Sequence, residues 1–231
     1  MKQWVSNSEN IVFFGGAGVS TESGIPDFRG MDGIYHMKYR YPPEEILSRH
    51  FFMERTKEFF DFYRDKMIYQ GAQPNLAHQK LKELEDIGKL KGIITQNIDG
   101  LHQMAGSRKV IELHGSIHHN YCMDCNKHYN LDYLLECGDV PRCTCGGIIK
   151  PYVVLYEEPL NGDDIAEAIA LMKSAEVLMI GGTSLSVYPA AGFIDYFRGE
   201  KIILINKEMT SFDSRANLLI NASIGEVLSQ I

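Results

Sequence analysis

The feature that most constrains this chain of 231 residues is a glycine-rich turn directly after a short apolar run. The run Ile11 to Phe14 is apolar enough for a strand buried on both faces, and Gly15, Gly16 and Gly18 follow at once. A strand that leads through such a turn into a helix is typical of dinucleotide-binding units, because glycines let backbone amides approach a pyrophosphate at a helix N-terminus. The turn therefore predicts an α/β fold with a nucleotide site beside its first strand.

The glycine spacing alone leaves a simple tight turn as the alternative. The usual dinucleotide fingerprint has a third glycine where this chain has Thr21, and about 20 residues later it has a carboxylate that binds a ribose. Here the turn is followed by a polar, irregular stretch that includes Pro26 to Gly30. A nucleotide site in this chain must therefore differ from that fingerprint.

Apolar runs and amphipathic stretches alternate along the rest of the chain. We expect strands over 11–14, 92–95, 110–113, 152–155, 177–180 and 201–205, and crossover helices over 76–87 and 165–172. This order predicts a Rossmann-like α/β fold, with a parallel sheet and helices on both faces. Two stretches, the helical 44–69 and the turn-rich 118–150, interrupt the alternation, and we expect them to pack together as a small lobe.

Four of the five cysteines form two close pairs. Two residues separate Cys122 from Cys125, one separates Cys143 from Cys145, and 17 residues lie between the pairs. This arrangement in a turn-rich segment is typical of four thiolates that bind Zn²⁺ tetrahedrally. Because four thiolates leave no position for water, we predict one zinc ion with a structural role.

Other interpretations of the cysteine segment stay open. Disulfides or buried free thiols would use the same residues, and three nearby histidines offer alternative ligands, namely His118, His119 and His128. The fifth cysteine, Cys137, lies in an apolar stretch and is expected to be a small core residue.

A second group of polar residues lies near the middle of the chain. Residues 95–99 read Thr-Gln-Asn-Ile-Asp, and residues 112–115 read Glu-Leu-His-Gly. His114 ends a predicted strand, so we expect it at the C-terminal edge of the sheet, where such folds bind ligands. An imidazole titrates near neutral pH, which suits a general base. His78 and His102 lack such a position and are expected to be structural.

Composition limits the partners and the location. The chain has no run of about 18 apolar residues, and its N-terminus lacks the apolar part of a signal peptide, so we expect a soluble, cytoplasmic protein. The formal charge of −7 gives no attraction to DNA or anionic membranes. We therefore expect no specific nucleic acid and no membrane as partner, whereas lysine-rich protein segments are favoured.

Motifs along nearly the whole chain resemble those of one family. In order they are Gly-Ala-Gly-x-Ser at 16–20, Gly-Ile-Pro-Asp-Phe-Arg-Gly at 24–30, Thr-Gln-Asn-Ile-Asp at 95–99, Leu-His-Gly at 113–115, the four cysteines, Gly-Gly-Thr-Ser-Leu at 181–185 and Val-Tyr-Pro-Ala-Ala at 187–191. Their order and spacing resemble the sirtuin family of NAD-dependent protein-lysine deacylases, and the chain is most similar to its compact bacterial members.

The resemblance implies one sirtuin catalytic domain that uses NAD and carries one structural zinc ion. Its Rossmann-like large lobe would comprise about 1–30, 72–116 and 151–231, and its small lobe about 31–71 and 117–150, with the zinc module at 118–150. The implied activity is deacetylation of lysines in acetyl-lysine-containing proteins or peptides. The acetyl group is transferred to ADP-ribose, and nicotinamide is released.

The resemblance also implies site residues. His114, Asn97 and Asp99 would be catalytic, with His114 as general base for a ribose hydroxyl. The implied NAD contacts are Ala17, Gly18, Thr21, Asp27, Phe28, Arg29, Gln96, Asn97, Ile98, Asp99, His114, Thr183, Ser184, Asn206 and Ile224. For Ile224, a core position in the last helix is the alternative. The substrate would bind as an extended strand, with residues 186–188 on one side and, on the other, Val153, Val154, Leu155, Tyr156 and Glu157.

The chain departs from the family pattern beside the expected groove. The family usually has glycine where this chain has Glu157, which leaves the local backbone and the peptide preference open. Members that prefer succinyl groups carry Tyr-x-x-Arg, whereas this chain has Tyr63-x-x-Lys66. Because lysine lacks the planar guanidinium group that pairs with a carboxylate at two points, we expect the preferred acyl group to be neutral.

The resemblance leaves alternative functions open. They are a protein ADP-ribosyltransferase or a desuccinylase on the same scaffold and, more distantly, a non-catalytic NAD sensor or a zinc-ribbon nucleic-acid binder.

Overall fold

A computed structural model describes residues 1–28, 30, 33–36 and 39–231. Its largest element is a six-stranded parallel sheet with the strand order β3-β2-β1-β7-β8-β9. The strands are β1 (Ile11–Gly15), β2 (Leu90–Thr95), β3 (Val110–Glu112), β7 (Val177–Gly181), β8 (Lys201–Ile205) and β9 (Leu218–Ile220). The predicted Rossmann-like fold is confirmed, with five of its strands close to their predicted ranges.

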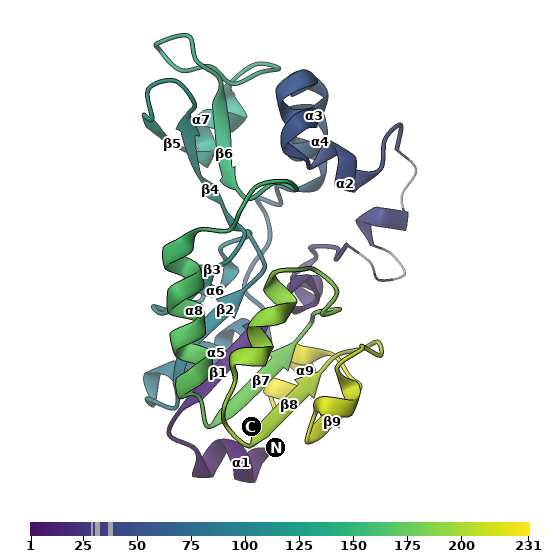
Figure 1. The fold of residues 1–231 in the computed structure, drawn as a ribbon, viewed down its shortest axis with the longest axis vertical. Helices are drawn as coiled ribbons and strands as arrows, with labels where there is room; N and C mark the ends of the chain where they lie inside the picture. Colours follow the sequence, from purple (N-terminus) through teal and green to yellow (C-terminus); the bar gives the residue numbers. More distant parts are fainter. Residues whose placement is uncertain (29, 31–32, 37–38) are drawn as a thin grey trace.

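Helices cover both faces of this sheet, which explains why its central strands are apolar throughout. Val12 and Phe14 pack with α8 (Gly162–Ser174) and η4 (Ala190–Tyr196) on one face. Ile11 and Phe13 pack with α5 (Leu76–Asp86) and α9 (Ile224–Leu228) on the other, beside α1 (Lys2–Asn7). Figure 1 shows α8 along one side of the sheet and α1 at its lower end.

A smaller antiparallel sheet, with the order β5-β4-β6, stands at the other end of the molecule (Figure 1). Its strands are β4 (Gly115–Cys122), β5 (His128–Asn130) and β6 (Ile149–Val153), and α7 (Leu131–Glu136) packs against it. Beside it lie α2 (Pro43–Ile46), α3 (Arg49–Glu54) and α4 (Thr56–Lys66). Phe52, Phe59 and Phe60 from these helices share one buried cluster with Ile117 and Leu134. The two insertions therefore pack together, as the sequence predicts.

Two predictions about local structure are wrong. Residues 152–155 do not form a strand of the parallel sheet, because β6 ends at Val153 and pairs antiparallel with β4. A four-residue apolar run carries no information about strand direction, and that explains the error. No α-helix follows the glycine turn directly; two single-turn 3₁₀ helices do, η1 (Ala17–Val19) and η2 (Thr21–Ser23). The stretch 44–69 is helical as predicted, in three short helices broken near Leu47 and Arg55.

The remaining short elements are η3 (Ile34–His36), α6 (Leu101–Met104) and η5 (Asp213–Arg215). Among the described residues, no helix combines the length and the apolar character needed to cross a bilayer.

Candidate active site

A cavity of about 810 Å³ is lined by residues from both the large sheet and the small lobe. Every predicted NAD contact among the described residues lines it, and so do all five predicted substrate contacts. Arg29 lies outside the described residues. Residues far apart in the sequence, such as Asp27 and Ile224, which are separated by 197 positions, thus line one cavity.

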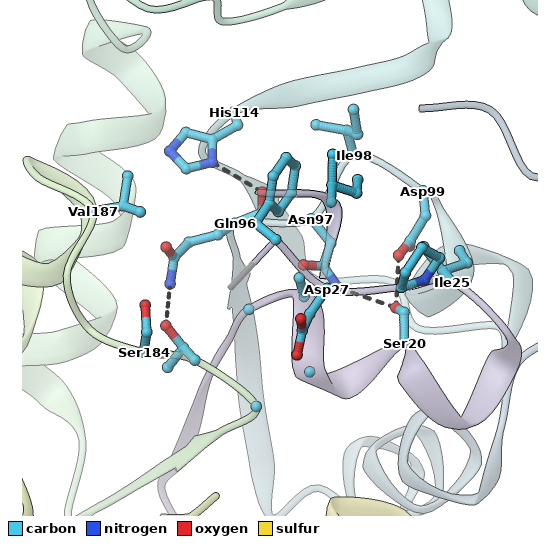
Figure 2. A pocket seen from close by; sticks show the side chains of 18 of the residues that line it. Ser20, Ile25, Asp27, Gln96, Asn97, Ile98, Asp99, His114, Ser184 and Val187 are labelled. Atoms are coloured by element: carbon cyan, nitrogen blue, oxygen red, sulfur yellow. Dashed lines mark hydrogen bonds between the residues drawn. The ribbon is translucent and has the colours of Figure 1, made fainter. Parts of the chain in front are cut away.

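His114 lies just beyond the end of β3, at the C-terminal edge of the sheet. Its Nδ1 is 2.9 Å from the carbonyl oxygen of Gln96, so Nδ1–H donates and Nε2 keeps its lone pair (Figure 2). Burial lowers the pKa of His114 below its ordinary value, and the hydrogen bond to Gln96 opposes this only in part. The imidazole is therefore neutral near pH 7 and can accept a proton at Nε2.

A buried serine joins the two other predicted catalytic residues. The Ser20 hydroxyl donates to Asp99 Oδ2 at 2.6 Å, and Asn97 Nδ2 donates to Ser20 Oγ at 3.1 Å (Figure 2). The amide of Leu101 donates to Asp99 Oδ1 at 2.9 Å. Sequence reasoning did not select Ser20 as a site residue, although it ends the Gly-Ala-Gly-x-Ser motif; only the folded chain brings this turn against residues 97–99.

The opposite side of the cavity is formed by the loops after β7 and β8. Gln96 Nε2 donates to Thr183 Oγ1 at 3.0 Å, which connects the loop after β2 to the loop after β7. Asn206 follows β8 directly and its side-chain amide donates to the carbonyl of Glu208. Ile224 is 4 % exposed at the start of α9 and also lines the cavity, so the residue belongs both to the core and to the site wall.

The glycine turn allows two backbone segments to touch. Gly18 donates its amide to the carbonyl of Gly182 at 2.8 Å, and a Cβ on Gly18 would lie 2.8 Å from Gly182 Cα. A Cβ on Gly16 would lie 2.8 Å from the Cβ of Thr183. The predicted helix-dipole contribution at this turn is wrong, because a single-turn 3₁₀ helix has almost no macrodipole. These glycines instead bring the loops after β1 and β7 together beside the cavity.

The small lobe forms another side of the cavity, where β6 is an edge strand of the small sheet. Beyond its end, Val154 donates its amide to the carbonyl of His114 at 2.9 Å, which connects this segment to the predicted base. The hydroxyls of Tyr156 and Tyr35 are 2.7 Å apart. Tyr63 is fully buried at the wall, and Lys66 lines the same cavity with its ammonium 3.0 Å from Asp65.

The four cysteines of the two pairs meet in the small lobe. The Sγ atoms of Cys122 and Cys145 are 3.5 Å apart, those of Cys125 and Cys143 are 3.6 Å apart, and all four lie within 4.8 Å of one another. Tetrahedral Zn²⁺ with Zn–S bonds of about 2.3 Å needs sulfur separations of about 3.8 Å, so the cluster suits a structural zinc ion. The thiols are free, which excludes the disulfide alternative.

Other candidate ligands and thiols lie apart from the cluster. Among the described residues, the group of potential metal ligands contains the four cysteines and none of the three neighbouring histidines. His118 Nε2 instead donates to the carbonyl of Asp99 at 3.1 Å. Cys137 is half-buried after α7, so the expected core position is wrong for this residue.

Three further titratable groups lie near the site: His78 and His102 are buried, and Glu112 is half-buried. The rings of His78 and His102 are 4.7 Å apart, and burial lowers the pKa of His78 to about 4 and that of His102 well below its ordinary value. Burial also raises the pKa of Glu112 to about 7, and the charge of Asp99 adds to this rise. The two histidines are thus neutral packing residues, in agreement with the sequence.

Comparison with known proteins gives a consistent result. The model of the Sir2 family matches residues 16–189. An NAD-dependent protein deacetylase of Clostridium tetani is 58% identical over 235 residues, which cover 100% of this chain and 95% of the relative. The deacetylase of the same name from Clostridium acetobutylicum is 56% identical, with coverages of 100% and 96%.

Solved structures of Sir2 proteins are also similar to this chain. A Sir2 structure with a deacetylated p53 peptide and 3′-O-acetyl ADP ribose superposes with a TM-score of 0.92 at 40% identity, covering 99% of this chain and 95% of that one. A complex of Sir2 with a p53 peptide and NAD⁺ has a TM-score of 0.88 at 39% identity, with coverages of 99% and 94%.

Proposed function

The chain belongs to the Sir2 family and is an NAD-dependent protein deacetylase, and we propose that His114 is the general base of its reaction. The observation that carries this proposal is the hydrogen bond from Nδ1 to the Gln96 carbonyl, which fixes the tautomer with a free Nε2. The lowered pKa keeps that nitrogen unprotonated at neutral pH. From the C-terminal edge of the sheet, His114 would accept the proton of a ribose hydroxyl.

The cavity fits NAD in its volume and its polar lining. Its volume of about 810 Å³ lies within the range of sites for cofactor-sized ligands. We propose that Ala17, Gly18 and Thr21 hold the pyrophosphate side and that Thr183, Ser184 and Asn206 hold the adenosine side. When bound, NAD would supply the ADP-ribose to which the acetyl group is transferred as nicotinamide leaves.

We propose that Asn97 and Asp99 orient the nicotinamide half. The hydrogen bonds through Ser20 hold both side chains in one geometry, and burial excludes water from that geometry. Asp99 lines the cavity while Ser20 and the Leu101 amide fix its carboxylate, so its charge would act at short range on a cationic ring. Phe28 and Asp27 line the same space and would cover it.

We propose that an acetyl-lysine peptide binds as an added strand along the edge of β6. The solved Sir2 structures hold p53 peptides, and β6 continues into cavity-lining residues 153–157. The acyl end would face Tyr63 and Lys66, where the ammonium near Asp65 makes a poor partner for a succinyl carboxylate. Acetyl or another neutral acyl group is therefore the proposed preference, which matched acetyl and succinyl peptides would test.

Reduced thiolates in the zinc cluster favour the cytoplasm as the proposed location. The charge of −7 is the basis for proposing that neither nucleic acid nor a membrane is a partner.

Product analysis tests the proposed chemistry. We expect mass spectrometry of an acetyl-lysine peptide incubated with the protein and NAD to find deacetylated peptide, nicotinamide and acetyl-ADP-ribose in equal amounts, and no reaction without NAD. Protein-bound ADP-ribose as the main product would instead identify an ADP-ribosyltransferase. If His114→Ala formed the same products in the same yields as the wild-type protein, His114 would not be the general base.

A further inference from the structure

Glu157 occupies a backbone conformation that side chains rarely adopt. Its φ of +76° lies in the left-handed region, where an L-residue with a Cβ is disfavoured and glycine is not. Glu157 also lines the cavity, at the end of the segment proposed to bind the peptide. A glutamate in this position therefore requires other contacts that hold it there.

Those contacts come from the first turn of α3. Glu157 Oε2 accepts a hydrogen bond from the backbone amide of His50 at 3.1 Å, and Oε1 lies 2.7 Å from His50 Nδ1. Both carboxylate oxygens are thus engaged by one residue, which fixes the orientation of the carboxylate. The hydrogen bonds from His50 also lower the pKa of Glu157, so the carboxylate is charged at neutral pH.

The backbone around this contact joins the two segments further. Tyr156 donates its amide to the carbonyl of Leu47 at 2.9 Å and accepts from the amide of Arg49 at 3.0 Å. Arg49 also pairs with Glu158 at 3.1 Å. The segment 156–158 is therefore attached to the linker between α2 and α3, and the Glu157–His50 contact is at the point where its backbone turns.

We propose that His50 and Glu157 are positioning residues that hold segment 155–157 in the geometry that binds the acyl-lysine peptide. The inference rests on the proposed peptide groove along β6. His50 itself does not line the cavity, so it acts through Glu157. Without the contact, the strained Glu157 backbone would relax, and segment 155–157 would leave this geometry for part of the time. Peptide binding would weaken, whereas kcat would stay unchanged.

The test measures KM for the acetyl peptide, KM for NAD and kcat in the full-length zinc-bound protein. We expect His50→Ala, which removes the Nδ1 hydrogen bond but keeps the backbone amide, to raise the peptide KM about three- to tenfold, the range expected for one hydrogen bond at a half-exposed site, with kcat and the NAD KM unchanged. His50→Asn, whose amide nitrogen replaces Nδ1, should restore most of the affinity. Glu157→Gly, which tolerates the positive φ, should have a smaller effect than His50→Ala.

A double variant separates this proposal from a general loss of structure. With glycine at position 157 there is no carboxylate to lose, so adding His50→Ala should change the peptide KM no further. Glu58→Ala removes an exposed ion pair with Arg55 in the same lobe and is the control that should leave all three constants unchanged.

An unchanged peptide KM in His50→Ala, or equal changes in the peptide KM, the NAD KM and kcat, would overturn the positioning role. Both results leave the deacetylase activity of the wild-type protein in place. Loss of the proposed function itself would appear as wild-type protein that forms no acetyl-ADP-ribose.

Discussion

The two walls of the cavity are built in different ways. On the large-sheet wall, polar site residues follow strands that are buried on both faces, and hydrogen bonds such as Gln96 to Thr183 fix them. On the small-lobe wall, Val153 and Leu155 belong to a second apolar cluster with Phe59 and Phe60. A separate small cluster, formed by Cys122, Cys143 and Ile149, is buried around the thiols. We infer from this comparison that the wall proposed for the cofactor is held by an apolar core alone, whereas the wall proposed for the substrate adds a thiol cluster suited to zinc and local contacts to its apolar core.

The largest effect is expected where the two walls meet. His114 bonds to Gln96 on one side and accepts from the Val154 amide on the other. We expect His114→Ala to lower kcat for deacetylation by about 10²- to 10⁴-fold, the usual contribution of a general base. Affinity for ADP-ribose should stay within about tenfold. Steady-state kinetics and calorimetry measure the two, and a kcat within a few-fold of wild type would contradict the assignment.

The next largest effect is expected from substitutions in the thiol cluster, which belongs to the small-lobe wall alone. Cys122→Ser or Cys143→Ser removes one of four thiolates, so the variant should lose its zinc, unfold at a lower temperature and deacetylate poorly. Elemental analysis of the wild-type protein should find about one zinc per chain. Cys137→Ser is the matched control, because Cys137 lies outside the cluster and should change little. A serine variant that is metal-free yet fully active and stable would show that the small lobe needs no metal.

A third, smaller change tests the large-sheet wall by itself. Asp99→Asn keeps the shape of the side chain but removes the charge that accepts from Ser20. We expect nicotinamide exchange and deacetylation to fall together, whereas the zinc content stays unchanged. Normal exchange in this variant, measured with labelled nicotinamide, would place Asp99 outside the reacting part of the site.

The smallest expected effect is on stability and depends on pH. Because Glu112 has a folded pKa of about 7, raised from 4.5, it contributes stability that is present below about pH 4.5 and is lost as the pH rises through 7. Glu112→Gln should therefore gain about 2 kcal/mol in free energy of unfolding, relative to wild type, between pH 5 and pH 8. Denaturant unfolding at both values measures it, with the exposed Glu83→Gln as control; a gain that does not vary with pH would show that Glu112 titrates normally.

The large-sheet wall was readable from the sequence because its signals are local. An apolar run fixes each central strand, and a polar residue just after the run, such as His114 or Asn206, must lie at the edge of the sheet. The cysteine spacing was equally informative. Ser20 was missed because its role depends on two loops, 77 or more residues apart, that meet only in the fold.

The small-lobe wall was harder to predict. Nothing in the four residues 152–155 distinguishes a strand of the parallel sheet from the edge of an antiparallel one. The departure at Glu157 was visible as a changed residue, but its partner His50 is 107 positions away. The division into two lobes by residue number stays a prediction.

The most direct test of the difference between the walls is to remove zinc and measure both sides in one sample. After treatment with a chelator, we expect affinity for ADP-ribose, measured by calorimetry, to stay within about tenfold, because the residues proposed to contact the adenosine and the pyrophosphate follow strands of the large sheet. Turnover of the acetyl peptide should be lost and should return when zinc is restored. Full turnover without zinc, or equal loss of ADP-ribose binding and turnover, would contradict the account.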